Sequence, residues 1–367
     1  MAQTVFVGLS GGVDSAVSAA LLKAEGYAVV GVFIKIWQPE FIECTWAKDR
    51  LDAMRVAASL GIAFKEVDLS ADYQKEVVAE MIASYERGET PNPDVACNRK
   101  IKFGTFAKWA RENGADIIAT GHYARTRREF GTAELLRAID TNKDQSYFLY
   151  QLDKNDLLKT IFPVGDMTKP EVRAKAKALD LPVADKHDSQ GLCFIGDVSM
   201  RDFLKRFITV EEGAVLNTKG EAIGRHDGAA LYTLGQRHGF VVEGLPAQKP
   251  QYVTALDTTK NTITVSENKL DAACTRVRVR EITWVGKLPK LPVRVLAQSR
   301  YRETPVSVTV ERTDDVYVTF DEPHIASPGQ SIVFYDGDIC LGGAIVDARC
   351  EDVSVHSMVE TTLEKVQ

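Results

Sequence analysis

The 367-residue sequence has no apolar run close to the roughly 20 residues that a membrane-spanning helix needs. Residues 1–10 also lack the basic segment followed by a long apolar core that marks a secretory signal. These absences argue against a helical membrane protein and against secretion. We therefore expect a cytoplasmic protein with no membrane partner.

Cysteine is scarce as well. The six cysteines, at positions 44, 97, 193, 274, 340 and 350, are too few and too scattered for a disulfide framework in a chain of this length. No two of them form a CxxC pair, which excludes a zinc ribbon and a thioredoxin-type redox motif, and we assign no metal site. The default expectation for each cysteine is a small buried apolar side chain.

Positive charge is not in excess, because 51 acidic residues oppose 45 basic ones. A formal net charge of -6 argues weakly against a general nucleic-acid coat but leaves room for a local basic patch. Residues 274–302 hold eight basic residues and one acidic residue, whereas residues 303–367 hold three basic and thirteen acidic residues. This basic segment is either an ordinary solvated β surface or a phosphate-binding face with arginines projecting from a strand.

Apolar runs and helical periodicity alternate over the first 120 residues. Strands are predicted at residues 4–8, 29–34, 64–69 and 116–120, with helices between them. This alternation predicts an α/β domain with a doubly wound parallel sheet at 1–204. From about residue 205 short alternating runs replace the helices, which predicts a small mixed or β domain at 205–273 and a β-barrel or sandwich at 274–367.

A glycine-rich loop joins the first predicted strand to the first predicted helix. It reads Gly8-Leu9-Ser10-Gly11-Gly12-Val13-Asp14-Ser15. Glycines let successive N–H groups converge on an anion, and the positive end of the following helix favours the same anion. The loop has neither a Gly-x-Gly-x-x-Gly nor a Gly-Lys-Ser/Thr pattern, so a dinucleotide fold and a Walker loop are not supported. We interpret it as a phosphate cradle rather than a simple tight turn.

Two cysteines stand in polar loops of this predicted domain, 96 residues apart. Cys97 follows a proline-stiffened loop near the start of a helix predicted over 99–112, where the helix N-terminus and nearby basic residues favour a thiolate. Those basic residues are Arg99, Lys100 and Lys102. Asp94 is close enough in sequence to exchange a proton with a bound substrate. Cys193 alone is typical of a buried core thiol, but its pairing with Cys97 in one domain favours a reactive role.

Residues 8–15 resemble the PP-loop of the N-type ATP pyrophosphatases, which holds the β- and γ-phosphates of ATP. The whole chain is similar to the tRNA-specific 2-thiouridylases. This resemblance rests on matching strings that occur in family order at residues 8–15, 91–104, 120–124, 143–150, 188–195, 232–237 and 327–330. It implies an adenine nucleotide alpha hydrolase-like catalytic domain, then a central domain and a C-terminal β-barrel that both contact tRNA.

The resemblance also implies an enzyme, a tRNA-uridine 2-sulfurtransferase. In the implied reaction the wobble uridine of tRNA is flipped out, ATP adenylates its C2 oxygen, and a persulfide delivers sulfur to C2. The products are 2-thiouridine, AMP and pyrophosphate. Cys193 matches the cysteine that carries the persulfide. Cys97 matches the one that attacks the persulfide or the activated base, and the two can end as a disulfide.

Cofactors and partners follow from the same resemblance. ATP is expected with Mg²⁺, whose ligands are unassigned apart from Asp14 as a candidate. The sulfur donor is either a relay carrier protein or a cysteine desulfurase. The matched nucleotide contacts are Ile34, Gly121 and the loop residues Gly8, Leu9, Ser10, Gly11, Gly12, Val13, Asp14 and Ser15. Matched positions that face tRNA or its target base are Asn92, Pro93, Asp94, His122, Lys143, Asp144, Gln145, Arg300, Tyr301 and Gln330.

Two other functions fit parts of the sequence. A different ATP pyrophosphatase, such as a ligase or an amidating synthetase, accounts for the glycine-rich loop but gives no reason for Cys97 and Cys193. A tRNA-binding or translation-associated protein without catalytic activity accounts for the basic segment but not for an intact loop.

Overall fold

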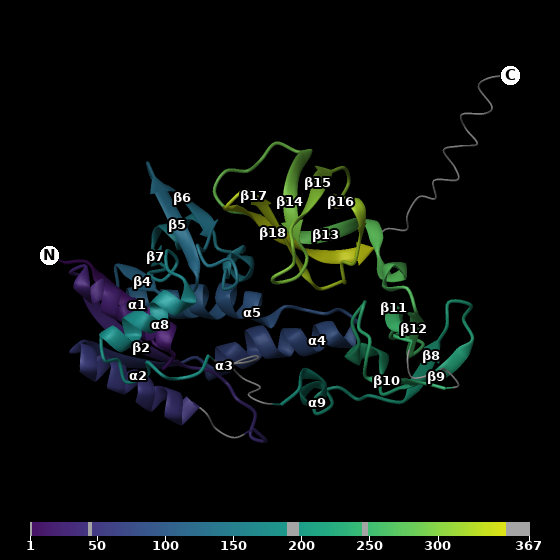
Figure 1. Ribbon diagram of the computed structural model, residues 1–367, viewed down its shortest axis with the longest axis horizontal. Coiled ribbons are helices and arrows are strands. Elements are labelled where there is room, and N and C mark those ends of the chain that lie inside the picture. Colours follow the sequence, from purple (N-terminus) through teal and green to yellow (C-terminus); the bar gives the residue numbers. More distant parts are fainter. Residues whose placement is uncertain (1, 43–45, 189–197, 244–248, 350–367) are drawn as a thin grey trace.

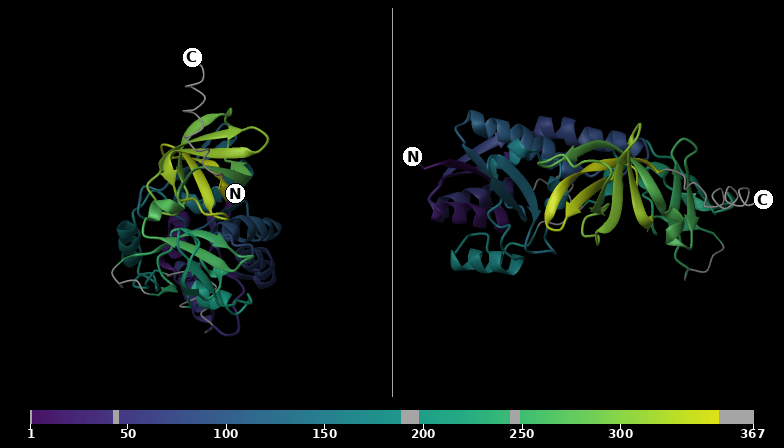
Figure 2. Two further views of the ribbon diagram at one scale, coloured as in Figure 1. Left: turned by 90° about the vertical axis from the view of Figure 1, so that its right-hand side faces the viewer. Right: turned by 90° about the horizontal axis from the view of Figure 1, so that it is seen from above.

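A computed structural model describes residues 2–42, 46–188, 198–243 and 249–349. Three β-sheets organise these residues, one for each part of the chain that the sequence distinguishes. The N-terminal domain lies at one end of the molecule and the central domain at the other, with the C-terminal barrel above and between them (Figure 1). The view from above shows the same elongated arrangement (Figure 2).

The first sheet is parallel and has the strand order β3-β2-β1-β4-β7. Its strands are β1 (Thr4–Gly8), β2 (Ala28–Lys35), β3 (Ala63–Asp68), β4 (Ile117–Ala119) and β7 (Thr160–Ile161). Side chains of β1 alternate between the two faces, so Val5 and Val7 belong to one core and Phe6 to another. Helices cover both faces, and the prediction of a doubly wound sheet is confirmed.

The helices divide between these two cores. The core that contains Val5 and Val7 also takes side chains from α1 (Val13–Ala24), α2 (Trp46–Leu60) and α8 (Lys169–Ala178). Six consecutive helical segments bury their apolar sides with Phe6: α3 (Ser70–Tyr73), η1 (Gln74–Ala79), α4 (Glu80–Glu86), α5 (Pro93–Ala96), η2 (Cys97–Thr105) and α6 (Phe106–Glu112). The short segments η3 (Ser146–Leu149) and α7 (Lys154–Leu158) follow.

The strand order reverses between β1 and β4, because β2 lies on one side of β1 and β4 on the other. In open α/β sheets such a point, at the carboxyl ends of the strands, is where ligands bind. The loops that follow β1 and β4 meet there. A Cβ atom on Gly121 would lie 2.7 Å from the backbone nitrogen of Ser15, so glycine is required for this close approach.

The central domain is a small, mostly antiparallel sheet with the order β10-β9-β8-β12-β11. Its strands are β8 (Gly213–Leu216), β9 (Ala222–His226), β10 (Phe240–Val242), β11 (Tyr252–Asp257) and β12 (Thr262–Ser266). Short helical segments border it: α9 (Met200–Leu204), η4 (Ala229–Leu231) and η5 (Lys269–Ala272).

The C-terminal sheet closes into a barrel, because β13 pairs with both β16 and β18. The barrel strands are β13 (Cys274–Trp284), β14 (Val293–Gln298), β15 (Val306–Arg312), β16 (Val316–His324), β17 (Ser331–Asp336) and β18 (Ile339–Arg349). A hairpin of β5 (Ala124–Glu129) and β6 (Thr132–Arg137) extends this sheet through the pairing of β6 with β18. The hairpin belongs to the N-terminal part of the chain and was not expected from the sequence.

Within the described ranges, no helix is both long enough and apolar enough to cross a membrane.

Candidate functional site

The glycine-rich loop has the geometry of an anion cradle. Gly11 adopts a φ of 72°, and a Cβ there would lie 2.3 Å from the carbonyl oxygen of Asp49, so no other residue fits. Gly12 stands at the N-cap of α1 without a side-chain cap, and the first amide groups of a helix have no intrahelical acceptor. The hydroxyl groups of Ser10 and Ser15 lie 3.2 Å apart at the same place. Backbone and hydroxyl donors therefore converge where a phosphate would bind.

A cavity of about 330 Å³ opens beside this loop, and we call it the loop cavity. Its apolar part comes from the end of β2 and the start of α2 and suits the face of a purine ring. The loop cavity is lined by Gly8, Leu9, Ser10, Asp14, Ser15, Phe33, Ile34, Ile36, Gln38, Trp46, Asp49, Cys97, Ile101, Lys102, Thr120, Gly121, His122 and Gln145. The structure thus brings Cys97 together with the predicted phosphate loop, Ile34, Gly121 and His122.

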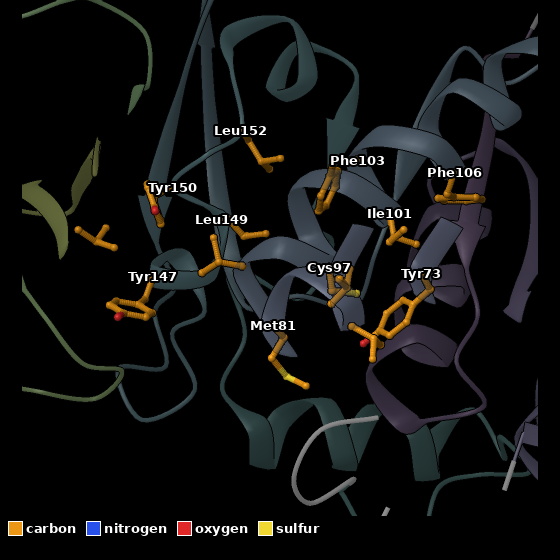
Figure 3. Close-up of a cluster of buried hydrophobic side chains, with 14 of the residues drawn as sticks. Tyr73, Met81, Cys97, Ile101, Phe103, Phe106, Tyr147, Leu149, Tyr150 and Leu152 are labelled. Atoms are coloured by element: carbon orange, nitrogen blue, oxygen red, sulfur yellow. The ribbon is translucent and has the colours of Figure 1, made fainter. Parts of the chain in front are cut away.

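Cys97 reaches the loop cavity from a helix that begins earlier than the sequence predicted. The helix begins at Pro93 instead of residue 99, because the Asn92 side chain caps it by accepting from the backbone N–H of Val95 at 3.3 Å. Cys97 therefore lies one turn inside the helix, its backbone N–H is bonded within that helix, and the expected effect of the helix N-terminus is weaker. Its side chain is buried near Tyr73 and Ile101 (Figure 3).

The segment that carries Cys97 is wound as a π-helix over η2. Such widened turns are rare and occur often at functional sites. Of the three basic residues expected near Cys97, Arg99 pairs with Asp156 at 2.8 Å and Lys100 with Glu76 at 3.6 Å. Only Lys102 lines the loop cavity. It is therefore the member of this group placed to favour negative charge there.

His122 is held as a neutral ring. Its Nδ1 lies 2.7 Å from the Thr120 hydroxyl and its Nε2 lies 3.4 Å from the Lys102 ammonium group. Burial lowers the pKa of His122 well below its ordinary value, and the charge of Lys102 lowers it further. A bound base would form a hydrogen bond with Nε2 of this imidazole in exchange for Lys102, because the Thr120 hydroxyl holds Nδ1.

Asp94 does not line the loop cavity, and although part of the residue reaches solvent, its carboxyl group is surrounded by protein. Desolvation raises the pKa of the Asp94 carboxyl, and the nearby charge of Lys102 opposes this rise. Its predicted role in proton exchange stays a prediction. Pro93 is buried at the first turn of α5, and Asn92 serves as the cap of that helix.

A second cavity of about 300 Å³ adjoins the first, and we call it the lysine cavity. It shares Ser10, Asp14, Asp49 and Gln145 with the loop cavity. Its remaining lining residues are Gly12, Val13, Tyr123, Lys143, Lys169, Lys186, His187, Asp188, Tyr301 and Arg302. Lys169 and Lys186 carry no local signal for this site, because only folding brings them to the loop, and Arg302 is expected from the sequence only as one of the basic residues of 274–302.

Lys169 connects two carboxylates at this cavity. It is buried, and its ammonium group lies 2.6 Å from Asp14 and 2.9 Å from Asp188. Burial raises the pKa of Asp188, but hydrogen bonds from Lys143 and Lys169 outweigh that effect and hold the pKa well below its ordinary value. Asp14 also accepts a hydrogen bond from the Tyr123 hydroxyl at 2.9 Å. Asp14 is therefore fixed in position at the start of α1.

The other residues predicted to face tRNA have partners inside the protein. Buried Asp144 pairs with Arg137 at 3.1 Å and accepts hydrogen bonds from Ala138 and Ser146. The Gln145 side-chain oxygen accepts a hydrogen bond from the backbone N–H of Tyr123. A direct contact of Asp144 with tRNA would break several of its bonds, so the structure gives this residue a structural role and its tRNA contact stays a prediction.

Residues of the barrel contact the other two domains. The Arg300 guanidinium group donates to the carbonyl of Leu234 in the central domain at 3.1 Å. The Tyr301 ring packs against Phe148 with centroids 4.5 Å apart. The Gln330 amide donates to the carbonyl of Thr90 at 2.7 Å, just before the loop that leads to Cys97. The barrel therefore supports the segment that positions Cys97.

The same segment is held by an ion pair, which gives a stability prediction. Arg280 makes two parallel contacts of 3.1 Å with Glu89. Burial raises the pKa of Glu89, but Arg280 and Arg87 outweigh this effect and the pKa is lowered. Replacing Glu89 by Gln is expected to lower the free energy of unfolding by about 1–3 kcal/mol at pH 7.

The pH dependence of this loss follows from the direction of the shift. A carboxyl group whose pKa is lowered on folding stabilises the protein at neutral pH, and this contribution is lost as the pH falls through the folded-state pKa. Urea unfolding at several pH values should show the Glu89→Gln difference shrinking towards acid. Glu86→Gln, an exposed change three residues away, serves as the control. A difference that stayed constant with pH would contradict the assignment.

Part of the basic segment at 274–302 is neutralised across strands. Arg276 pairs with Glu311 at 2.9 Å, Arg278 with Asp347 at 2.6 Å, and Arg280 also contacts Asp347 at 3.0 Å. For the arginines of β13 these carboxylate partners favour the interpretation as an ordinary β surface. The alternative of a phosphate-binding face stays a prediction.

Among the cysteines that the structure describes, only Cys97 lines either cavity. Cys274 and Cys340 are buried in the barrel, as the default expectation has it. Burial raises the pKa of Cys340 to about 12, which makes its thiolate inaccessible. Cys193 lies outside the described residues, as do Cys44 and Cys350.

Comparison with known families covers nearly all of the chain. The model described as "tRNA methyl transferase HUP domain" matches residues 3–197. That of the "tRNA methyl transferase PRC-barrel domain" matches residues 201–267, and that of the "Aminomethyltransferase beta-barrel domain" matches residues 274–346. The three matched ranges follow the order of the three sheets.

Curated relatives align along the same length. A protein of Mannheimia succiniciproducens named tRNA-specific 2-thiouridylase MnmA is 44% identical over 356 residues, which are 94% of this chain and 92% of that one. A protein of the same name from Pseudomonas fluorescens (strain Pf0-1) is 44% identical over 352 residues, 94% of each chain.

Solved structures are more distant. The U34-tRNA thiolase NcsA from Methanococcus maripaludis is 19% identical, with 56% of this chain and 63% of that chain covered and a TM-score of 0.35. A 4-thiouridine synthetase in complex with RNA and bound ATP is 18% identical, with 56% and 50% covered and a TM-score of 0.34. Similarities this low carry no argument about the site.

A doubly wound sheet with a glycine-rich loop at its switch point, followed by two β domains, defines an enzyme of the PP-loop class. Cys97 adds a cysteine side chain to the lining of this site. The chain belongs to the family of tRNA-specific 2-thiouridylases. These are tRNA sulfurtransferases, so the expectation of an enzyme of this kind is confirmed.

Proposed function

We propose that the protein converts the wobble uridine of tRNA to 2-thiouridine, with ATP as the activating substrate and a cysteine persulfide as the immediate sulfur source. The observation that carries this proposal is that Cys97 and the phosphate loop line one cavity. A nucleotide held by the loop and a base brought to Cys97 would therefore meet in the same enclosure. The family and the PP-loop support tRNA and ATP as substrates.

Activation is the first step of the proposed reaction. The C2 carbonyl of uracil is a poor electrophile, and its oxygen is a poor leaving group. Attack of the C2 oxygen on the α-phosphorus of ATP forms an adenylate and breaks the bond to pyrophosphate. The loop donors and Lys102 stabilise the charge that develops on the phosphates. The neutral ring of His122 contacts the flipped base.

Sulfur transfer is the second step. A sulfur atom from the persulfide attacks C2, and AMP leaves with the former C2 oxygen. The outer sulfur of a persulfide becomes a sulfide equivalent only when two electrons are supplied. The Cys97 thiolate supplies them by forming a disulfide with Cys193, and a thiol reductant then restores both thiols. Cys97 acts either on the persulfide itself or after the activated base has been attacked.

Mg²⁺ is proposed to bind with ATP. Magnesium in such sites uses one or two carboxylates together with substrate phosphates. Asp14 and Asp49 line both cavities and are the carboxylates that would hold it. The Mg²⁺ ion would neutralise part of the negative charge of the phosphates. The sulfur donor, the cytoplasmic location and the domain limits 1–204, 205–273 and 274–367 also stay predictions.

The two alternatives are weaker. A carboxylate-activating ligase or amidating synthetase would use the loop, but it has no use for a cysteine beside the nucleotide. A tRNA-binding protein without activity does not agree with membership of an enzyme family or with an intact loop.

A product assay tests the proposal. The protein is incubated with unmodified tRNA, ATP, Mg²⁺ and a sulfide source, and both nucleosides and nucleotides are identified. We expect 2-thiouridine at the wobble position together with AMP and pyrophosphate in equal amounts. Formation of ADP would contradict the adenylation step.

Replacing Arg300 by Ala gives a test of the tRNA contact. Arg300 has no carboxylate partner among the residues described, so its charge is available to a phosphate. Loss of one phosphate contact is expected to weaken tRNA binding and to lower the slope of log affinity against log salt by about 1. Titrations at several salt concentrations measure this slope. An unchanged slope would remove Arg300 from the interface.

A further inference from the structure

The lysine cavity is built by the first and the last domain together. Ser10, Gly12 and Val13 reach it from the phosphate loop and the start of α1. Tyr301 and Arg302 reach it from the loop between β14 and β15 of the barrel. Residues almost 300 positions apart therefore enclose one space next to the uncapped N-terminus of a twelve-residue helix.

The other charged side chains of this cavity balance one another. Each lysine contacts at least one carboxylate at 2.6–2.9 Å, and the carboxylates share their partners. The balanced set consists of the lining cations Lys143, Lys169 and Lys186 and the lining anions Asp14, Asp49 and Asp188, with Arg173 and Asp52 behind them as further partners of Asp188 and Lys186. Without Arg302 the charges of this set sum to zero.

Arg302 makes the cavity positive. No carboxylate in the described part of the chain lies within ion-pair distance of it. Its guanidinium carbon lies 5.1 Å from the centroid of the Tyr301 ring, which in turn packs on Phe148. The residue adopts a φ of 62°, a left-handed backbone conformation that residues other than glycine rarely adopt. The Arg302 guanidinium group therefore lies against the Tyr301 ring, in the lining of the cavity beside the glycine-rich loop.

We propose that Arg302 of the barrel is a ligand of the pyrophosphate group of ATP and of the pyrophosphate product, where these occupy the lysine cavity beside the PP-loop. This inference rests on the proposed adenylation reaction. Lys143 and Lys169 donate to the same anion while they remain on Asp188 and Asp14, since an ammonium group has three donors. Arg302 provides a planar pair of donors that fits phosphate oxygens. The barrel thereby completes a phosphate site that the first domain leaves without net positive charge.

The test compares four forms of the full-length protein: wild type, Arg302→Gln, Arg302→Lys and Arg312→Gln. Arg312 is an exposed arginine at the end of β15, outside both cavities, and serves as the matched control. Binding of magnesium pyrophosphate and of AMP is measured by calorimetry. Arg302→Gln is expected to weaken pyrophosphate binding about tenfold. Arg302→Lys is expected to recover part of it, and Arg312→Gln should bind as the wild type does.

AMP separates this inference from the proposed function, because AMP has no pyrophosphate group. We expect its affinity to be equal in all four forms. If Arg302→Gln loses tRNA affinity but binds pyrophosphate like the wild type, Arg302 is a tRNA contact and the inference is wrong. If the wild type makes ADP while Arg302→Gln still binds pyrophosphate tenfold more weakly, the proposed function fails and the anion site stands.

Discussion

Replacing Gly11 by Ala is expected to reduce ATP-dependent AMP formation about a hundredfold or more. Gly11 has a φ of 72°, and a Cβ there would overlap the carbonyl oxygen of Asp49 at 2.3 Å. The carbonyl oxygen belongs to the backbone and a Cβ is bonded directly to Cα, so neither atom can rotate away. The loop or α2 must shift, and the donors that converge on the phosphate are then out of place. Steady-state assays of AMP formation against ATP concentration measure the loss.

Gly26→Ala is the matched control for this change. Gly26 follows the other end of α1 and also has a positive φ, 89°, but no atom lies within 4 Å of a Cβ there. It is expected to be destabilised by about 1 kcal/mol from backbone strain alone, with the ATP dependence unchanged. If Gly11→Ala kept the wild-type rate, or if both variants lost it equally, the close approach at Gly11 would not explain the effect.

Replacing Cys97 by Ser is expected to lower 2-thiouridine formation by about a thousandfold or more, because a hydroxyl group can neither supply two electrons to a persulfide nor form a disulfide. Adenylation uses the loop and not the thiol, so pyrophosphate release from ATP in the presence of tRNA should persist. Quantifying thiolated nucleoside and pyrophosphate in the same reaction separates the two steps. Loss of both products together would show that Cys97 supports the fold of the cavity rather than sulfur transfer.

Cys340→Ala controls for the removal of a thiol. Cys340 is fully buried on β18, in the core that the barrel shares with the N-terminal domain, and burial raises its pKa to about 12, so it has no thiolate at neutral pH. We expect full thiolation by this variant at temperatures where it is folded. A thiolation defect as large as that of Cys97→Ser would mean that thiolation activity depends on barrel packing rather than on the chemistry of Cys97.

Much of the fold could be predicted because its signals are local. Alternation of buried strands and helices predicts the parallel sheet, and alternating valines predict the barrel strands β15 and β16. The β5–β6 hairpin was missed because β5 is mainly charged, with arginines at 125, 127 and 128. Its pairing with β18 joins residues about 200 positions apart, and no local pattern encodes such a contact.

Some residues of the site could likewise be predicted from local sequence motifs, and others could not. Gly11, Ser15 and Cys97 stand in compact motifs, so the sequence alone pointed to them. Lys169 could not be found in this way, because its buried bridge between Asp14 and Asp188 exists only after α8 packs against α1.

The charge pattern along the chain predicts only part of the charge distribution on the folded protein. A count along the chain shows a basic segment followed by an acidic one, but it does not show that antiparallel pairing places one against the other. Arg278 on β13 meets Asp347 on β18, so part of this charge is compensated within the barrel. Two of the cations without an ion pair in the described residues are in the loop between β14 and β15, where Arg300 and Arg302 face the other two domains.

The central claim is that the C2 oxygen of uridine is adenylated before sulfur enters, and an oxygen label tests it most directly. A tRNA carrying ¹⁸O at C2 of the wobble uridine is thiolated by the wild-type protein, and the AMP is analysed by mass spectrometry. The proposed mechanism predicts one ¹⁸O atom in the phosphate of each AMP formed per 2-thiouridine. Unlabelled AMP, with the ¹⁸O recovered in water, would contradict it.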